Sequence, residues 1–302
     1  MISVKPLTIA CFGEALWDIL PRGIFAGGAP LNTAYHLSRH GLRALPISAV
    51  GKDFLGQELL RRVAAWQIDS RPIARLADRP TGTVRAELDA KGNATYRIAR
   101  NVAWDRIPVP KALLRQPPPA AIVFGTLALR ENSNGHTLDT LLAAWPETLR
   151  VLDINLRRPF DRGRPIAFAL QRAQLLKLNA DELAKLVGVA SLHGRSVEAA
   201  TRKLAEQHGL TRVCVSAGPY GAGLWWEGEW FWENARPVAV RDTVGAGDAF
   251  LAALLAGLLS RHEKPAAALA AACRMGEFVA GCDGATPAYV CNARGRPRPL
   301  PT

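Results

Sequence analysis

The most informative stretch of this sequence is Asp242-Thr243-Val244-Gly245-Ala246-Gly247-Asp248, which runs directly into the apolar residues 249–259. Two glycines let the backbone turn tightly and approach a ligand without a side-chain clash. The first N–H groups of a helix have no partner within it, and they lie at the positive end of the helix dipole. We therefore expect a turn into a helix here that can bind an anion such as a phosphate.

Asp248 would lie in the first turn of that helix, beside the bound anion. A carboxylate repels an anion, so its presence calls for a chemical task, and removing a proton from an attacking hydroxyl is such a task. On residue types alone, an ordinary turn with Asp248 as the helix cap is an equally good interpretation, because short glycine motifs recur by chance.

Short apolar runs alternate with helical patterns along most of the chain. The predicted strands include residues 9–13, 45–50, 121–124, 151–154, 175–178 and 213–216. The predicted helices include residues 32–40, 57–66, 137–144, 166–171, 181–187 and 197–207. This alternation indicates an α/β domain in which helices cover both faces of a mainly parallel sheet.

Two segments depart from that alternation. Residues 81–100 show two alternating runs around the turn residues 89–93, which predicts an exposed β-hairpin that serves as a lid or a dimer edge. A second hairpin, rich in tryptophan, is predicted over residues 224–231. The Pro- and Arg-rich residues 292–302 are predicted to form a mobile tail.

The chain has 302 residues and a formal net charge of +12, so a nucleic-acid partner has to be considered. The basic residues are scattered rather than gathered in one run, and no nucleic-acid-binding motif occurs. We expect a basic surface that attracts a small anion such as ATP, and no nucleic-acid partner.

The five cysteines are odd in number, form no Cys-x-x-Cys pair and have no histidine at ligand spacing. This pattern favours a reducing, cytoplasmic location and argues against disulfides or a zinc site. The apolar residues 249–259 are too few to span a membrane, so no membrane association is expected.

Three further segments can supply polar contacts to ligands. Asp18, Gly28 and Asn32 can contact a polyhydroxylated ligand, and residues 178–182 place two carboxylates and an amide at a strand end, which suits Mg²⁺. Residues 216–223 follow a strand and can surround a nucleotide. Taken singly, each segment is explained at least as well by a glycine turn or a capped helix start.

Several other chemistries lack their motifs. The sequence contains no P-loop, no Gly-x-Gly-x-x-Gly in the first strand–helix unit and no Gly-x-Ser-x-Gly elbow. The six histidines show no metal-ligand spacing.

Taken in order, these segments resemble the ribokinase-like, or PfkB, family of carbohydrate kinases over about residues 9–287. Residues 242–248 match the family's C-terminal signature Asp-Thr-x-Gly-Ala-Gly-Asp, Gly27-Gly28 with Asn32 match its N-terminal signature, and residues 179–182 match its Asn-x-x-Glu element. Residues 13–18, 124–130 and 153–157 look like fructokinases in particular.

The resemblance implies a ribokinase-like three-layer α/β/α fold, a single kinase domain over residues 1–302, with lid elements at about residues 15–27 and 79–101. It implies ATP and Mg²⁺ as cofactors, with transfer of the γ-phosphoryl group to a primary hydroxyl of a sugar. The lid would close over the sugar and exclude water. An exposed hairpin edge also makes a homodimer an expectation.

The resemblance also implies a role for individual residues. Asp248 would act as the general base, and the amides of Gly245, Ala246 and Gly247 would stabilise the transferring phosphoryl group. The residues expected to hold the sugar are Asp18, Gly28, Asn32 and Arg157. The residues expected on the nucleotide side are Asn179, Ser216, Gly218 and Gly221. Glu182 would position Mg²⁺ through water, and a K⁺ ion is expected near Asp242, Val244 and residues 284–286.

Fructose is the first expectation for the substrate, and two alternatives stay open. The Asp-x-Asn-x-Arg element at residues 153–157 also resembles 2-keto-3-deoxygluconate kinases, and Arg157-Arg158-Pro159-Phe160 departs from the usual ending with Leu-Trp. A nucleoside kinase is a further alternative. On the nucleotide side, Cys273 stands where many relatives have an asparagine beside the adenine. A non-catalytic sensor of sugar or nucleotide is disfavoured by the intact residues 245–248.

Overall fold

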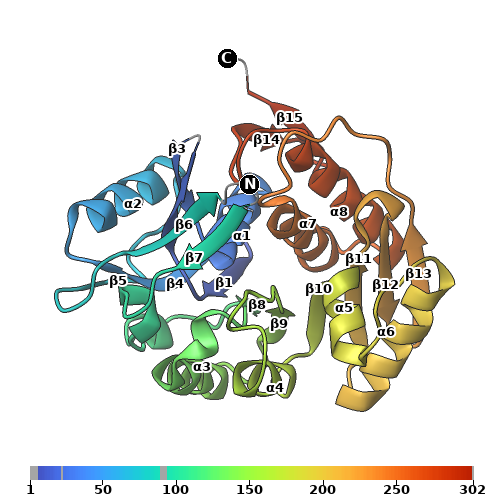
Figure 1. Cartoon of the computed structure of the whole chain (residues 1–302), viewed down its shortest axis with the longest axis horizontal. Coiled ribbons are helices and arrows are strands. Elements are labelled where there is room, and N and C mark those ends of the chain that lie inside the picture. The colour runs from blue at the N-terminus through green and yellow to red at the C-terminus, as the bar shows by residue number, and fades with distance from the viewer. Residues whose placement is uncertain (1–5, 22, 89–93, 301–302) are drawn as a thin grey trace, which may run out of the picture.

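The largest sheet is built from strands spread over most of the chain, in a computed structural model that describes residues 6–21, 23–88 and 94–300. Its strands are β1 (Thr8–Phe12), β4 (Arg43–Gly51), β5 (Ile73–Leu76), β8 (Ala121–Phe124), β9 (Leu149–Asp153), β10 (Leu175–Asn179), β11 (Arg212–Ser216), β12 (Ala222–Trp226) and β13 (Glu229–Glu233). Within the described residues they lie in the order β13-β12-β11-β10-β9-β8-β1-β4-β5 (Figure 1). All neighbours from β5 to β11 are parallel, and β12 and β13 are antiparallel additions.

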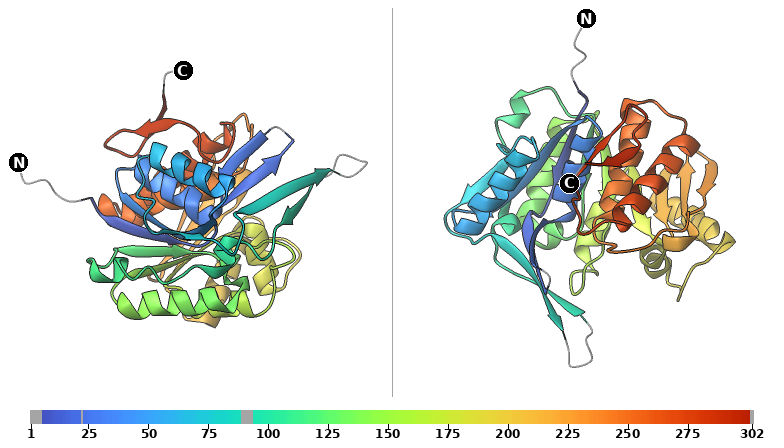
Figure 2. Two further views of the ribbon diagram at one scale, coloured as in Figure 1. Left: turned by 90° about the vertical axis from the view of Figure 1, so that its left-hand side faces the viewer. Right: turned by 90° about the horizontal axis from the view of Figure 1, so that it is seen from above.

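Helices cover both faces of this sheet, as the alternation of patterns predicts (Figures 1 and 2). One face carries α3 (Asn132–Ala144), α4 (Arg164–Leu170), α5 (Ala180–Val187) and α6 (Arg195–His208). The other carries α1 (Ala29–Arg39), α2 (Phe54–Ala65), α7 (Ala246–Leu255) and α8 (Pro265–Ala280). Successive strand residues alternate between the two layers of core: Phe12 packs with the first set of helices and Cys11 with the second. The predicted three-layer α/β/α fold is therefore confirmed.

A second, smaller sheet projects from the body of the molecule (Figure 2). It consists of β2 (Leu16–Leu20), β3 (Gly23–Gly27), β6 (Gly82–Leu88) and β7 (Ala94–Ile98), in the order β3-β2-β6-β7. Strands β6 and β7 form the hairpin predicted over residues 81–100, although its turn at residues 89–93 lies outside the described residues. Strand β2 joins the two hairpins by pairing in parallel with β6.

The C-terminal region has more regular structure than the sequence suggests. The segment predicted as a mobile tail, residues 292–302, contains β15 (Pro297–Pro299), which pairs antiparallel with β14 (Tyr289–Cys291). The turn between these strands is closed by Asn292, whose side chain accepts hydrogen bonds from the amides of Arg294 and Arg296. The sequence did not indicate this pairing, because proline is unfavourable in most strands. An edge strand tolerates proline, and β15 is such a strand.

The apolar residues after Asp248 form two consecutive helices packed against each other. Helix α7 continues through a π-helical turn at Ala256–Ser260 before α8 begins. Within the part of the chain that the structure describes, no helix is long and apolar enough to cross a membrane.

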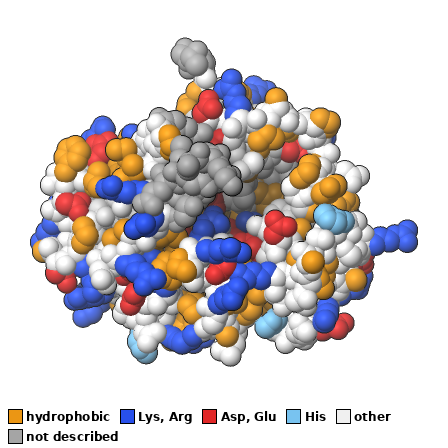
Figure 3. All heavy atoms as spheres, in the orientation of Figure 1, with side chains coloured by type: hydrophobic (Ala, Val, Ile, Leu, Met, Phe, Trp, Pro, Cys, Tyr) orange, Lys and Arg blue, Asp and Glu red, His pale blue; other side chains and the backbone are white. Residues whose placement is uncertain are grey.

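Basic side chains do not gather into one band on the face shown in Figure 3, where they alternate with acidic and apolar groups. Many arginines pair with acids on their own or neighbouring elements, as Arg61 does with Glu58 and Arg202 with Glu198. This distribution fits the expectation of a generally basic surface.

The base of the small sheet is attached to the body by a buried ion pair. Arg130 donates from Nε and Nη2 to the Asp105 carboxylate at 2.7 and 2.9 Å, and from Nη2 to the carbonyl of Ala99 just beyond β7. The Arg130 side chain is 4% exposed and that of Asp105 is 1% exposed. The guanidinium also lies over the Trp104 ring at 4.1 Å from its centroid.

We predict that Arg130→Met lowers the free energy of unfolding by about 3–5 kcal/mol, because it leaves the Asp105 carboxylate buried without its partner. The matched control is Arg106→Met, which breaks an ion pair with Asp78 whose side chains are 58% and 56% exposed. That control should cost no more than about 1 kcal/mol. Denaturant unfolding of both variants measures the difference, and equal losses would contradict a special role for the buried pair.

Candidate active site

The residues of the candidate site lie where parallel strands end and helices begin. Asn179 ends β10, Ser216 ends β11 and Asp153 ends β9, so their side chains lie at the same edge of the sheet. Helix α7 begins at this edge, and its first turn contains Asp248. Open α/β sheets bind their ligands at this edge, outside the carboxyl ends of the strands.

Asp248 is buried, with 8% of its surface exposed, and it is held by a side chain from another helix. Asn32 of α1 donates from Nδ2 to Asp248 Oδ2 at 2.9 Å, a contact between residues 216 positions apart in the chain. Burial raises the pKa of Asp248 to about 7, and the nearby Asp153 carboxylate adds to this rise. Lys177, the Asn32 hydrogen bond and Arg157 oppose it. A carboxyl group with this pKa can accept a proton near neutral pH.

The turn before α7 offers two of the three amide donors that the sequence predicts. Gly245 adopts a left-handed conformation with φ of 80°, which a glycine accepts readily. The amide of Ala246 already donates to the carbonyl of Thr243 at 3.3 Å, so it is not free as expected. The amides of Gly245 and Gly247 have no hydrogen-bond partner among the described residues. These two remain as donors for an anion at the start of α7.

A buried ion pair below this turn is an unexpected part of the site. Lys177 of β10 lies beside Asp153 of β9 and donates from Nζ to both carboxylate oxygens at 3.1 Å. Burial alone would lower the pKa of Lys177, but the surrounding acids, led by Asp153, raise it above its usual range, so the ammonium stays charged. A Cβ atom on Gly247 would lie 2.9 Å from Lys177 Nζ, so glycine at this position leaves room for the ammonium.

Lys177 has a recognisable signal in the sequence. It is the single charged residue within the apolar run Leu175–Leu178, and a lone lysine in a buried strand requires a partner. Asp153 belongs to the Asp-x-Asn-x-Arg element, which by itself gives this residue no role. Only the parallel register of β9 and β10 places the two side by side.

The region predicted to bind the sugar is lined by hydrogen-bond acceptors. Asp18 of β2 faces Gly27, where a Cβ atom would lie 2.1 Å from the Asp18 carboxylate, so glycine is needed for this approach. A Cβ atom on Gly28, whose φ is 109°, would lie 2.3 Å from the carbonyl oxygen of Glu14, so any larger residue would clash with that backbone. Burial raises the pKa of Asp18 to about 6, and Arg157 opposes the rise.

Glu14 is a further acidic residue of the candidate site, and no role was predicted for it from the sequence. It is 4% exposed, and burial raises its pKa to about 7. Its Oε2 atom and the Oδ1 atom of Asn32 are buried without a hydrogen-bond partner among the described residues. Buried acceptors without partners are costly, so a ligand with several hydroxyl donors suits this region. Arg157 is exposed, and its charge acts on Glu14, Asp18 and Asp248.

Asn179 and Glu182 form the capped helix start that was the alternative interpretation of residues 178–182. The Asn179 side chain accepts from the Glu182 amide, and Glu182 Oε2 accepts from the Asn179 amide, both at 2.8 Å. Glu182 Oε1 accepts from the amide of Leu156 at 2.8 Å, which fixes the residue next to Arg157. Each Glu182 oxygen keeps one lone pair and can accept one further hydrogen bond, such as one from a water molecule.

The loop predicted to contact the nucleotide depends on glycine. Gly218 and Gly221 have φ of 54° and 122°, and a Cβ atom on Gly221 would lie 2.0 Å from the carbonyl oxygen of Glu233. The amide of Ala217 donates to the carbonyl of Gly221, which closes the loop directly after Ser216. Cys273 of α8 is buried, with 6% exposed.

Asp242 connects the two segments that were expected to lie near a cation, the turn before α7 and residues 284–286. Its Oδ1 accepts from the amide of Val244 at 3.0 Å, and its Oδ2 accepts from the amide of Gly284 at 3.2 Å. The signature turn and residues 284–286 are therefore neighbours, as expected. Within the described ranges, no cluster of three or more His, Cys, Asp or Glu side chains could hold a metal ion by itself.

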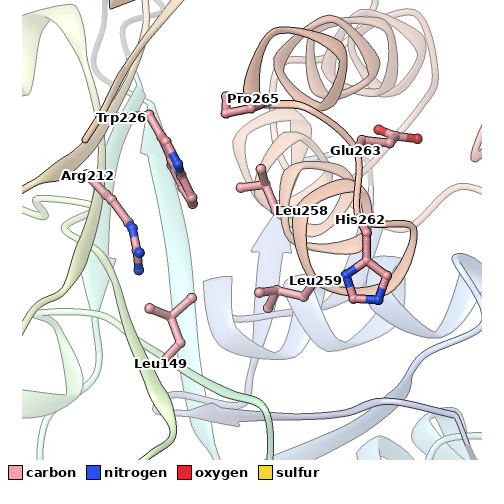
Figure 4. A pocket seen from close by; sticks show the side chains of 8 residues that line it. All are labelled: Leu149, Arg212, Trp226, Leu258, Leu259, His262, Glu263 and Pro265. Carbon is pink, nitrogen blue, oxygen red and sulfur yellow. The ribbon is translucent and has the colours of Figure 1, made fainter. Parts of the chain in front are cut away.

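Figure 4 shows a separate pocket, which lies where strands β9 and β11 begin, opposite their carboxyl ends. Leu149 and Arg212, the first residues of β9 and β11, line it together with Trp226, Leu258, Leu259, His262, Glu263 and Pro265. None of the predicted site residues lies there, so it is separate from the site around Asp248.

The geometry around Asp248 agrees with a family comparison that covers most of the chain. A model described as pfkB family carbohydrate kinase matches residues 22–290. The chain belongs to the pfkB family of carbohydrate kinases. A fructokinase from Klebsiella pneumoniae is 31% identical over 261 residues, covering 82% of this chain and 82% of the relative. A fructokinase from Rhizobium leguminosarum bv. trifolii is 29% identical over 271 residues, covering 83% and 79%. This pfkB member is an ATP-dependent carbohydrate kinase.

Solved structures of other carbohydrate kinases share the fold of this pfkB protein. Fructokinase with bound ATP from Xylella fastidiosa has a TM-score of 0.79 at 21% identity, covering 92% of this chain and 94% of the other. A fructokinase double mutant from Vibrio cholerae, bound to fructose, ADP and potassium, has a TM-score of 0.77 at 21% identity, covering 94% and 95%. The 2-dehydro-3-deoxygluconokinase of Thermotoga maritima reaches 0.81 at 17% identity, covering 92% and 95%. The fold alone therefore does not distinguish a neutral sugar from a sugar acid.

The charges around Asp248 predict opposite changes in the pH dependence of kcat/KM. Activity that needs ionised Asp248 falls as the pH drops through the pKa of this group. Asp153→Asn removes a negative charge that raises this pKa, so the acid limb should move to lower pH. Lys177→Met removes a positive charge that lowers it, so the limb should move to higher pH.

Steady-state profiles between about pH 5 and pH 9 measure both shifts. Lys177→Arg, which keeps the charge, is the control and should leave the limb closer to that of the unaltered protein. Shifts of the same sign in Asp153→Asn and Lys177→Met would show that the pair does not act on Asp248 through its charges.

Proposed function

We propose that this carbohydrate kinase transfers the γ-phosphoryl group of ATP to a primary hydroxyl of fructose, with Asp248 as the general base. The observation that carries the proposal is the position of Asp248. It is a buried carboxyl group with a pKa near 7, held by Asn32, next to two free amides at a helix start. A proton acceptor beside an anion-binding turn is the arrangement that phosphoryl transfer to an alcohol requires.

The reaction follows from these groups. The sugar hydroxyl oxygen forms a bond to the γ-phosphorus while the bond from that phosphorus to the β-phosphate oxygen breaks, and ADP leaves. The hydroxyl proton passes to the Asp248 carboxylate. Asn32 fixes the orientation of that carboxylate by donating to Oδ2, which leaves Oδ1 for the proton.

Positive partial and full charges surround the position proposed for the transferring group. The amides of Gly245 and Gly247 would donate to its oxygens, and the Lys177 ammonium adds a full positive charge close to Gly247. Fixed donors in a site that excludes water stabilise developing charge without reorganising during the reaction. Asp153 holds the ammonium in place by accepting from it on both oxygens.

A neutral polyhydroxy sugar suits the remaining groups best. Asp18, Glu14 and the side-chain oxygen of Asn32 offer acceptors to hydroxyl donors. The acidic side chains of Glu14, Asp18 and Asp248 disfavour a ligand that carries a carboxylate of its own. The relatives named as fructokinases support fructose among neutral sugars. Arg157 is the feature that favours the alternative, a 2-keto-3-deoxygluconate kinase, because its cation could pair with a sugar carboxylate.

Nucleotide and metal binding are proposed on the opposite side of Asp248. Ser216, Gly218 and Gly221 would contact the nucleotide, with Asn179 close to its phosphates. Glu182 would hold Mg²⁺ through water, and the ion would neutralise charge on the phosphates when bound. We place K⁺ beside Asp242, Val244 and the turn at residues 284–286. The small sheet would act as a lid, and its exposed edges support a homodimer. Free cysteines and ATP as a substrate favour a cytoplasmic location.

We predict that Asp248→Asn lowers kcat by at least about a hundredfold, the scale expected for loss of a general base, while ADP and sugar still bind. Calorimetric titration separates binding from turnover. Asp139→Asn, which alters a partly exposed carboxylate in α3 that has no proposed role in the site, is the matched control and should leave kcat unchanged. Turnover of Asp248→Asn within a few-fold of the control would remove Asp248 from the mechanism.

A substrate screen tests the sugar assignment separately. We expect ADP release to be fastest with fructose in a panel that includes 2-keto-3-deoxygluconate, ribose, other hexoses and nucleosides. Arg157→Met should change kcat/KM for fructose less than for the sugar acid, because a neutral sugar makes no ion pair. A response confined to the sugar acid would refute fructose and leave the family assignment intact.

A further inference from the structure

One stripe of helix α1 contacts two separate parts of the site. Asn32, Tyr35 and His36 are spaced by three and four residues, so their side chains lie on the same face of the helix. Asn32 donates to Asp248, as described above. Tyr35 and His36 instead contact residues 285–289, which follow α8.

His36 is completely buried, and both of its ring nitrogens have partners. Nε2 lies 2.9 Å from the carbonyl oxygen of Ala285, and Nδ1 lies 2.7 Å from the hydroxyl of Tyr289. A carbonyl only accepts, so the proton must sit on Nε2, and Nδ1 then accepts from the Tyr289 hydroxyl. Burial lowers the pKa of His36 to about 3, which keeps this neutral form throughout the physiological range.

Tyr35 holds the same loop at a second point. Its hydroxyl donates to the carbonyl of Pro287 at 2.5 Å. The loop is therefore fixed to α1 through two backbone carbonyls, those of Ala285 and Pro287. Its other side faces the turn before α7, where Asp242 accepts from the amide of Gly284.

Ala285 in turn sets the position of Gly245. A Cβ atom on Gly245 would lie 2.5 Å from Ala285 Cα and 2.6 Å from its carbonyl oxygen. The two backbones are thus in direct contact, and a displacement of Ala285 displaces Gly245, whose amide is one of the two donors proposed for the phosphoryl group. The carbonyl that Gly245 approaches is the one that accepts from His36.

We infer that His36 is a positioning residue for phosphoryl transfer, which sets the Gly245 amide through Ala285 while Asn32 on the same helix sets Asp248. The inference rests on the proposed roles of Gly245 and Asp248. One helical turn of α1 then fixes the distance between the base and the donor of the anion-binding turn. Neither contact involves the sugar or the nucleotide, so His36 affects the geometry of the reacting groups rather than the binding of either substrate.

A second histidine, at the C-terminal cap of the same helix, provides a matched control. His40 directly follows α1, and neither of its buried ring nitrogens has a hydrogen-bond partner within the described ranges. Its ring is buried without the contacts to residues 285–289 that His36 makes. His36→Leu and His40→Leu therefore both remove an imidazole from α1 or its C-terminal cap, but only the first releases the loop.

The experiment compares kcat, the KM for sugar and ATP, and thermal stability in His36→Leu, His36→Gln and His40→Leu. A misplacement of about 1 Å can cost up to about a hundredfold in rate, so we expect kcat of His36→Leu to fall by about ten- to a hundredfold. Both KM values should stay within about twofold. His36→Gln, whose amide can still donate to Ala285, should recover part of kcat, and His40→Leu should keep it.

A kcat for His36→Leu within about twofold of that for His40→Leu would overturn the inference. It would also be overturned if His36→Gln lost as much kcat as His36→Leu, even though the two variants differed in thermal stability. If His36→Leu does not fold, His36→Asn takes its place, because its shorter side chain withdraws the donor from the Ala285 carbonyl, and a kcat within about twofold of that for His40→Leu would overturn the inference. Asp248→Asn in the same assay separates the two proposals. An inactive Asp248→Asn beside a fully active His36→Leu contradicts only the role of His36.

Discussion

The hydrogen bond from Asn32 to Asp248 joins residues 216 positions apart at the point where chemistry is proposed. It holds a carboxyl group inside the protein at the start of α7, where water cannot stabilise its charge. Burial and the neighbouring Asp153 raise the pKa of that group, and Lys177 limits the rise. Burial, the largest cause, together with the charges around it, therefore leaves Asp248 with a pKa near neutrality.

Parallel strand order explains how distant residues reach this place. Strands β9, β10 and β11 end at the same edge, so Asp153, Asn179 and Ser216 arrive there together although they are far apart in the sequence. Helices α1 and α7 begin beside this edge and bring Asn32 and Asp248. The small sheet extends from the same side of the fold through β2, which carries Asp18. Loops and helix starts can vary here while the sheet keeps their relative positions.

Much of the fold could be predicted from the sequence because its signals are local. Apolar periodicity placed most strands and helices, and the turn residues between them indicated both hairpins. The pairing of β14 with β15 was missed, since Pro297 and Pro299 are unfavourable in most strands and only an edge position accommodates them. The parallel pairing of β2 with β6 also lay beyond local patterns, because it joins residues more than sixty positions apart.

The site was predicted less completely, for a related reason. The glycine turn and Asp248 form a continuous motif that can be recognised in the sequence. Whether each amide of the turn is already hydrogen-bonded depends on its exact backbone conformation, and the Ala246 amide donates to Thr243. Lys177, Glu14 and His36 act through partners on other elements, so no spacing along the chain reveals them. Their burial is what distinguishes them from ordinary surface groups.

The pKa of Asp248 measures the central claim most directly. Carbon-13 NMR of labelled aspartate carboxyl groups, titrated from about pH 4 to pH 9 and assigned by comparison with Asp248→Asn, reports this value in the folded protein. The account predicts a resonance that titrates near pH 7 and is missing from the variant. A resonance assigned to Asp248 that titrates near pH 4, the ordinary range for an exposed aspartate, would contradict it.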